Sequence, residues 1–192
     1  MTTGHAFYEC DDQNSSDVVY QGKSEDTIGT PWDFYGDINL DFALVNESSD
    51  SEIENGFADE VRTHKYSTVD ISGHVTEDGL HDRVGSTVVK YGARTCRETG
   101  PIDEIRDSGR CESSGADEIY YEICSGPGDS GAPYFETWED SGGCEWAVII
   151  GNHRGSPLGN NSESFGYAAH DMVSENDIEF GPTWSGTCGP IS

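Results

Sequence analysis

Residues Cys124–Phe135 read CSGPGDSGAPYF, and Ser130 stands in the middle of this glycine-rich loop. Gly128 and Gly131 can adopt backbone angles that other residues resist, so the amides around Ser130 can point to one spot. Amides that converge in this way stabilise an oxyanion, and a serine beside them is a nucleophile that requires a base. The loop therefore predicts a nucleophilic serine, and the rest of the chain must supply a histidine and a carboxylate.

The remainder of the sequence favours an all-β fold. Short runs rich in Val, Ile, Tyr and Thr alternate with clusters of Gly, Asp, Asn and Ser, as in sandwiches and barrels. Strands are predicted at residues 17–22, 41–45, 66–73, 86–92, 117–123, 132–138 and 146–152. One weakly amphipathic helix is predicted at 168–178, and a faint composition change at 72–83 indicates a join between two halves.

The charge of the chain is strongly negative. Asp and Glu number 37 against 10 Lys and Arg, only three of them lysine, which gives a formal net charge of -27. This charge repels nucleic acid and anionic membranes, and it destabilises a compact state unless salt screens it. Because the acids are spread along the chain rather than gathered in a tail, we expect a protein adapted to high salt. The alternative is an ordinary acidic secreted protein.

The cysteine content favours disulfides. The six cysteines form no C-x-x-C pair, which argues against a zinc or thioredoxin-like motif, and their even number suits an oxidising compartment. Cys96 and Cys111 are the favoured pair, because the Gly- and Asp-rich segment between them suits a hairpin. No apolar run is long enough to span a membrane, so we expect no membrane partner.

The candidate base and carboxylate lie near the start of the chain. His5 follows a small-residue turn in TTGHAF, and Asp41 opens the apolar strand in DINLDFALV. A buried carboxylate at a strand start needs a hydrogen-bond donor, and a histidine N–H is suitable. Asp37 is the competing carboxylate, and Asp41 is favoured because the apolar run begins directly after it. The competing interpretation is that His5 is an N-terminal histidine without a role and that Asp41 is a turn residue beside the strand.

Four segments in this order resemble the chymotrypsin-like serine proteases, specifically their bacterial secreted branch. TTGH and DFALV resemble the motifs around the histidine and aspartate of that family, and GDSGAP resembles its G-D-S-G-G-P. The segment at 88–102, VVKYGARTCRETGPI, resembles the hairpin that opens the second barrel in bacterial members. The resemblance implies a double β-barrel with one short C-terminal helix, divided into domains at 1–78 and 79–192.

The resemblance also implies the roles of individual residues. Ser130 attacks the scissile carbonyl, His5 carries the proton and Asp41 orients the imidazole, while the N–H groups of Gly128 and Ser130 form the oxyanion hole. A polypeptide substrate and a monomer are expected, with no organic cofactor. No metal site is assigned, because acidic loops such as SSDSEIE lack the spacing of an EF-hand loop.

Two further residues are paired by the resemblance. Lys90 takes the position of the basic residue that pairs with the aspartate preceding the nucleophile, here Asp129. An aspartate beneath the serine loop needs a cation, so the pairing is physically reasonable. The alternative is that Lys90 is a solvated strand residue.

The specificity segment is IGNHRGS at 150–156, which looks like the corresponding segment of staphylococcal-type glutamyl endopeptidases. By that resemblance His153 binds an acidic side chain before the cut, and Ser156 and Ser125 add donors. Ile123 stands where some such enzymes have a polar residue, and Arg154 also departs from the pattern.

The competing interpretation makes His153 a rim residue of a protease with broad preference. The other histidines receive no role: His64, His74 and His81 are expected at the surface, and His170 is expected to cap the helix.

The position of the histidine is unusual for this family. In the family the histidine follows the third strand of the first barrel, whereas here it is residue 5, and Ala6 replaces the usual cysteine, which leaves Cys10 without its expected partner. We therefore expect the first strands of the N-terminal barrel to be missing, with Met1 an internal methionine of a longer secreted precursor. The sequence predicts a secreted, salt-adapted serine endopeptidase; the alternative is an inactive binding module or fragment with the same fold.

Overall fold

The computed structural model describes main chain and side chains at residues 71–107, 116–139, 146–157 and 160–174. Outside these ranges it describes only the backbone of further strand and helix residues. In the first part of the chain these are β1 (Thr2–Thr3), β2 (Tyr8–Glu9), β3 (Asp12–Gln13), β4 (Val19–Tyr20), β5 (Thr27–Asp33), β6 (Phe42–Glu47), β7 (Gly56–Ala58) and the start of β8 (Thr68–Val75). His5, Asp37, Asp41 and His64 lie outside the described residues.

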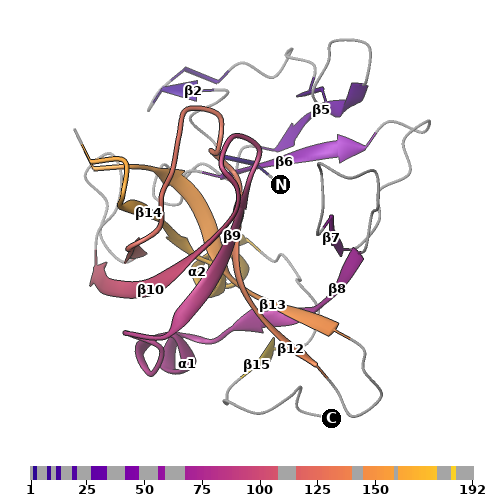
Figure 1. Cartoon of the computed structure of the whole chain (residues 1–192). Helices are drawn as coiled ribbons and strands as arrows, with labels where there is room; N and C mark the ends of the chain where they lie inside the picture. Colours follow the sequence, from indigo (N-terminus) through magenta and orange to yellow (C-terminus); the bar gives the residue numbers. More distant parts are fainter. Residues whose placement is uncertain are drawn as a thin grey trace.

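Six strands of the second half form a closed antiparallel barrel (Figure 1). In barrel order they are β9 (Thr87–Gly92), β10 (Cys96–Asp107), β11 (Asp117–Tyr121), β14 (Ser164–Ala168), β13 (Glu145–Gly155) and β12 (Pro133–Glu139). The ring closes where β12 pairs with β9, through Tyr134 opposite Lys90 and Phe135 opposite Val89. Because the barrel is closed, each of the six strands has a neighbouring strand on both of its edges.

Alternation of side chains along these strands produces two apolar layers. One cluster fills the barrel, with Val88, Ile102, Ile119, Tyr121, Tyr134, Val148 and Ile150 among its members. The other cluster consists of Val89, Phe135, Ala147, Ile149 and Ala169. Because successive strand residues point to opposite faces, Val88 and Lys90 share the inner face of β9, while Val89 faces outward. Ala169 begins α2 (Ala169–Asn176), so the outer cluster lies where this helix meets the barrel.

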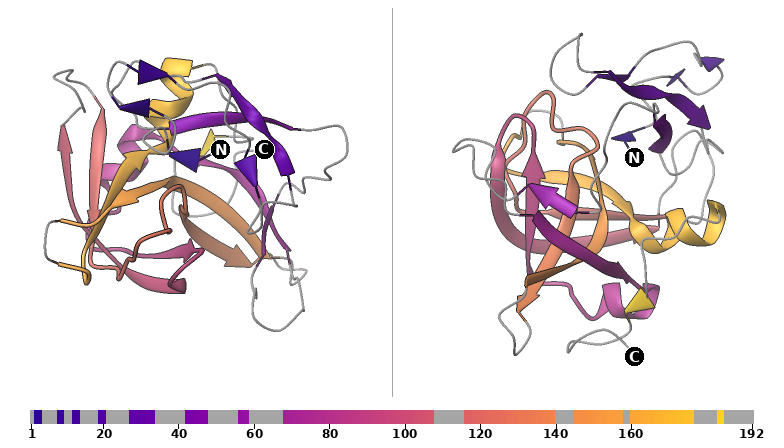
Figure 2. Two further views of the ribbon diagram at one scale, coloured as in Figure 1. Left: turned by 90° about the horizontal axis from the view of Figure 1, so that it is seen from above. Right: turned by 90° about the vertical axis from the view of Figure 1, so that its right-hand side faces the viewer.

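The first part of the chain contributes a smaller sheet beside the barrel (Figure 2). Its four strands are ordered β1-β6-β5-β4, and among the residues described there they form an open sheet rather than a closed barrel. Such an arrangement agrees with the expected N-terminal barrel without its first strands. The connecting strand β8 pairs in parallel with β13, and it also contacts β7 and the two-residue β15 (Thr183–Trp184).

The predicted strands and the C-terminal helix are confirmed, but other elements were not predicted, among them the strands β5 and β10. The segment 72–83, expected as a join, contains the end of β8 and the short helix α1 (Glu77–His81), which Thr76 caps by accepting a hydrogen bond from the Gly79 N–H. β14 was not predicted as a strand. The predicted domain boundary at residue 78 falls inside α1 and stays a prediction.

The histidines of this region differ in environment. The expectation that His74 lies at the surface is wrong, because it is buried at 4% exposure within β8. His81 is a surface residue as expected, with 56% of its side chain exposed. His170 lies in the first turn of α2 and bonds to carboxylates rather than to the helix end.

Two cysteines are described, and both are free thiols: Cys96 and Cys124. The structure therefore does not show the predicted pairing of Cys96 with Cys111, which lies outside the described residues. No helix in the described part of the chain is long and apolar enough to cross a membrane.

Candidate active site

The loop that carries Ser130 is a compact turn between β11 and β12. Gly128 and Gly131 both have positive φ values, 103° and 86°, which side chains disfavour. The turn is closed by hydrogen bonds from the Asp129 N–H to the Gly126 carbonyl (3.0 Å) and from the Ala132 N–H to the Asp129 carbonyl (2.9 Å). The two glycines therefore allow a backbone course that fixes Ser130 at an exposed tip.

Two amides of this turn remain without an acceptor. Within the described part of the chain, the N–H groups of Gly128 and Ser130 donate to no carbonyl or side chain, whereas those of Asp129, Gly131 and Ala132 all do. Ser130 itself is exposed, and its Oγ lies 3.4 Å from the Arg154 carbonyl oxygen. An accessible hydroxyl beside two uncommitted N–H donors suits a nucleophile next to an oxyanion site.

The side chain of Asp129 holds the turn in place through an ion pair and several hydrogen bonds. Its Oδ2 lies 2.9 Å from Lys90 Nζ, and neither side chain is exposed to solvent. Its carboxylate also accepts hydrogen bonds from the Thr95 hydroxyl (2.8 Å) and from the N–H groups of Arg94 (2.7 Å), Thr95 (3.1 Å) and Gly126 (3.1 Å). The backbone between β9 and β10 is thereby tied to the nucleophile loop.

The hydrogen bonds decide the charge state of this carboxylate. Burial by itself raises the pKa of Asp129, but the bonds from Lys90, Thr95 and Arg94 together lower it far below its usual range. Lys90 Nζ also donates to the Cys124 carbonyl at 2.7 Å, so the cation bonds to both sides of the loop. A Cβ at Gly92 would collide with the Asp129 carboxylate, so a glycine is required there.

The specificity segment lies directly beside the nucleophile loop. The Gly131 N–H donates to the His153 carbonyl (2.8 Å), and the His153 N–H donates to the Ala132 carbonyl (2.7 Å). Further along, the hydroxyls of Ser125 and Ser156 lie 2.6 Å apart, which brings together two of the predicted substrate-binding residues. The nucleophile loop and the specificity segment, which are far apart in sequence, are thus hydrogen-bonded to each other beside Ser130.

His153 is held by a chain of hydroxyl groups. Its Nδ1 lies 2.8 Å from the Tyr134 hydroxyl, which donates to Ser164 Oγ at 2.7 Å. His153, Tyr134 and Ser164 are each at most 2% exposed. Because the Tyr134 hydroxyl donates its proton to Ser164, its oxygen accepts a hydrogen bond from the Nδ1–H of the His153 imidazole. An imidazole that also offers an Nε2–H to a ligand would then carry a positive charge.

The two residues that depart from the specificity pattern have clear environments. Ile123 is 1% exposed and belongs to the barrel core. The Arg154 guanidinium lies over the rings of Phe165 and Tyr167, at 5.1 and 5.8 Å from their centroids, and 4.0 Å from a Glu118 carboxylate oxygen. Its cation is therefore engaged with β11 and β14.

The structure brings together the predicted residues that it describes: Ser130, Gly128, Asp129, Lys90, His153, Ser156 and Ser125. Three participants were not predicted, namely Thr95, Tyr134 and Ser164. The sequence gives only a weak indication of Tyr134, which follows the serine loop at the start of a strand. That strand pairs with the strand of His153. Nothing in the sequence marks Ser164. The proposed partners His5 and Asp41 lie outside the described residues.

Comparison with solved structures places this fold among known proteins. A glutamic-acid-specific serine protease, reported to use a histidine triad in substrate binding, matches with a TM-score of 0.62 at 19% identity. A chymotrypsin from Cellulomonas bogoriensis gives 0.60 at 17%, and protease A from Thermobifida fusca gives 0.61 at 19%. Each match covers 93% of this chain and 83%, 82% and 81% of the three structures respectively.

These likenesses show the fold, which is that of bacterial chymotrypsin-like serine proteases. No family model and no curated protein matches the sequence.

Proposed function

We propose that this protein is a serine endopeptidase whose nucleophile is Ser130. The observation that carries the proposal is the exposed hydroxyl of Ser130 between two uncommitted amides, on a turn anchored by the buried Asp129–Lys90 pair. The fold shared with three serine proteases supports the same chemistry. The buried ion pair holds the amides in position, and neither of its two side chains takes part in the reaction.

The reaction proposed is acyl transfer to water. Ser130 Oγ forms a bond to the scissile carbonyl carbon while its proton passes to His5, which Asp41 orients. The oxyanion accepts hydrogen bonds from the Gly128 and Ser130 N–H groups. The C–N bond then breaks as His5 returns the proton to the leaving amine, and water hydrolyses the acyl-enzyme ester by the same route in reverse.

We further propose that the enzyme prefers an acidic side chain before the cleaved bond. The support is His153, whose Nδ1 is hydrogen-bonded to Tyr134, together with the hydroxyls of Ser125 and Ser156, which lie 2.6 Å from each other. A substrate carboxylate would supply the negative charge that a buried imidazolium requires.

Secretion, function at high salt and a monomeric state remain part of the same proposal. The net charge of -27 supports function at high salt, where the repulsion between like charges is screened. The negative charge also disfavours nucleic acid as a partner.

The triad is tested by the rates of peptide hydrolysis of the secreted, full-length protein at molar salt. Ser130→Ala and His5→Ala should each abolish all but a small residue of activity. Asp41→Asn should lower turnover by about 10⁴-fold, as such a change does in a Ser-His-Asp triad. The matched control is Asp37→Asn, the competing carboxylate nearby, which should retain activity. Equal losses in both aspartate variants, or none in either, would contradict the assignment of Asp41.

Specificity is tested with paired peptides that differ only in Glu or Gln before the cut. Tyr134→Phe removes the hydroxyl between His153 and Ser164 and should lower kcat/KM on the Glu peptide by about tenfold, with less effect on the Gln peptide. Tyr120→Phe is the matched control, because its hydroxyl bonds to Glu118 instead. A wild-type enzyme that cleaves both peptides equally would remove the acidic preference and leave the peptidase proposal standing.

If the complete protein hydrolyses nothing under these conditions, the binding-module interpretation takes its place.

A further inference from the structure

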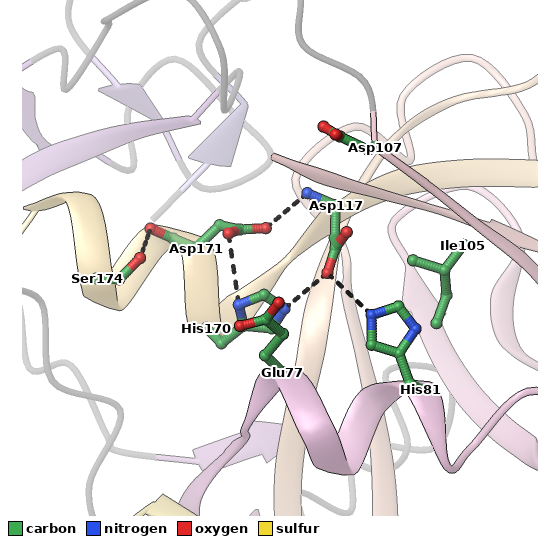
Figure 3. Close-up of a pocket in the computed structure, with 8 residues that line it drawn as sticks. All are labelled: Glu77, His81, Ile105, Asp107, Asp117, His170, Asp171 and Ser174. Atoms are coloured by element: carbon green, nitrogen blue, oxygen red, sulfur yellow. Dashed lines mark hydrogen bonds and ion pairs between the residues drawn. The ribbon is translucent and has the colours of Figure 1, made fainter. Parts of the chain in front are cut away.

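A second cluster of reactive side chains lies outside the nucleophile loop and the specificity segment (Figure 3). It lines an open pocket of about 480 Å³ where α1, α2 and the facing ends of β10 and β11 meet. Four carboxylates and two imidazoles face this pocket, and no Lys or Arg is among the described residues that line it. The lining residues are Glu77, His81, Ile105, Asp107, Asp117, His170, Asp171 and Ser174.

The arrangement follows from three elements. Glu77 and His81 are four residues apart on α1, so they share one face of that helix. Asp117 is the first residue of β11, and His170 lies in the first turn of α2. Three separate segments thus direct nitrogen and oxygen ligand atoms to one place.

The distances suit a metal held by Glu77, His81 and Asp117, with His170 beside Asp117. Asp117 Oδ2 lies 3.2 Å from His170 Nε2 and 3.9 Å from His81 Nε2. Bonds of about 2.0–2.1 Å in a tetrahedral zinc site place ligand atoms about 3.4 Å apart, between these two values. Ligand atoms of Glu77, His81 and Asp117 all lie within 4.8 Å of one another.

The second nitrogen of His170 is also oriented. Its Nδ1 lies 3.4 Å from Asp171 Oδ1, and Asp171 Oδ2 in turn accepts a 2.7 Å hydrogen bond from the Asp117 N–H. An ionised carboxylate can only accept a hydrogen bond, so His170 Nε2–H donates to Asp117 Oδ2 at 3.2 Å and orients that carboxylate. Carboxylates that bind metals are held by hydrogen bonds from a second shell of residues in the same way.

The charges around the pocket call for a cation. Four carboxylates face this pocket, and a divalent ion bound among them would lower their mutual repulsion. Mixed imidazole and carboxylate donors favour zinc and related transition metals, since calcium prefers six to eight oxygen ligands.

We propose that Glu77, His81 and Asp117 bind a divalent transition metal of the zinc class, with His170 as the hydrogen-bond partner of Asp117. The metal would join α1 to the start of β11, which makes it a structural site. None of these residues belongs to the nucleophile loop or the specificity segment, so the site does not depend on the proposed peptidase activity.

The test is direct metal binding by the full-length protein carrying Ser130→Ala, which prevents self-digestion. After dialysis against a chelator, Zn²⁺ alone is titrated at neutral pH and high salt, and bound metal is counted by mass spectrometry. One zinc per chain is expected, together with a raised Tm. Co²⁺ should bind in its place and give tetrahedral absorption bands without a thiolate charge-transfer band, which excludes the cysteines as ligands.

Variants identify the ligands. His81→Gln is preferred, because the exposed side chain of His81 makes loss of folding improbable, and it should weaken zinc binding by about 100-fold or more. His170→Gln, which removes the hydrogen-bond partner of Asp117, should weaken zinc binding by about 10-fold. Glu163→Gln, which changes an exposed carboxylate outside the pocket, should change nothing.

Two results would overturn the proposal. One is the absence of stoichiometric zinc binding by the folded protein. The other is binding that His81→Gln leaves unchanged and that Ca²⁺ reproduces with equal affinity, which would mark a diffuse acidic surface.

Discussion

Lys90 and Asp129 form an ion pair that is fully removed from water and lies beneath the proposed nucleophile. Removing one partner of such a pair leaves a buried charge without compensation. Lys90→Met should therefore lower the free energy of unfolding by about 3–5 kcal/mol, as measured by urea denaturation. Arg106→Met is the control: it breaks an exposed pair with Glu104 and should leave stability nearly unchanged. A Lys90→Met variant as stable as the control would contradict a structural role for the pair.

The pKa of Asp129 predicts how this stability depends on pH. Because the folded-state pKa is lowered, the stabilising contribution is complete above the unfolded value of about 4. It is lost as the pH falls toward the folded value, with a slope of at most about 1.4 kcal/mol per pH unit. The reference is the double variant Lys90→Met/Asp129→Asn, which lacks this titration. The difference in stability between wild type and reference should shrink between pH 5 and pH 2, and a constant difference would contradict the assignment.

The residues of the candidate site were predictable to different degrees. Ser130 was indicated by the glycines of its loop, whereas Lys90 and Asp129 were paired only through the resemblance of their segments to the serine protease family. Tyr134 and Ser164 were missed because any strand residue can be tyrosine or serine, and only the register between β12, β13 and β14 brings them to His153.

At the scale of elements, the barrel depends on close contact between β13 and β14. Gly166 of β14 lies opposite His153, and a Cβ there would collide with the Asn152 carbonyl of β13. Gly166→Ala should force these strands apart and destabilise the fold by about 1–3 kcal/mol. Gly155→Ala is the matched control in β13, since its Cβ would meet the Phe165 ring at an ordinary 3.5 Å. Thermal unfolding compares the two, and equal midpoints would contradict this account of the strand contact.

The elements themselves show where sequence patterns suffice. Strands such as β11 and β13 were predicted because their runs of Val, Ile and Tyr are bounded by clusters of Gly, Asp, Asn and Ser. β14 was missed because SFGYA has a glycine at its centre, which weakens a strand pattern. The helix α1 has five residues, too few for a helical period to show, and only its cap and packing reveal it.

For the molecule as a whole, charge is the dominant feature. A net charge of -27 on 192 residues produces self-repulsion that reaches across the surface at low ionic strength. The screening length falls from about 10 Å at 0.1 M salt to about 3 Å at 1 M. The Tm should therefore rise steeply over this range of KCl, and far less in sorbitol of matched osmolality. A Tm that does not rise with KCl would contradict adaptation to salt.

The fold class followed from the ordered motifs and the strand pattern together, and the closed barrel confirms it. The proposed triad could not be predicted in the same way, because His5 and Asp41 must lie beside Ser130 although they come from another part of the chain. No local sequence pattern specifies such a long-range contact.

The central claim is that Ser130 is an activated nucleophile, and covalent labelling tests it most directly. The protein is treated with a fluorophosphonate at molar salt, and the adduct is located by peptide mass spectrometry. The account predicts one adduct per chain, on Ser130, that is lost in His5→Ala and retained in Tyr120→Phe. A folded protein with no adduct, or with labelling elsewhere that Ser130→Ala leaves unchanged, would contradict it.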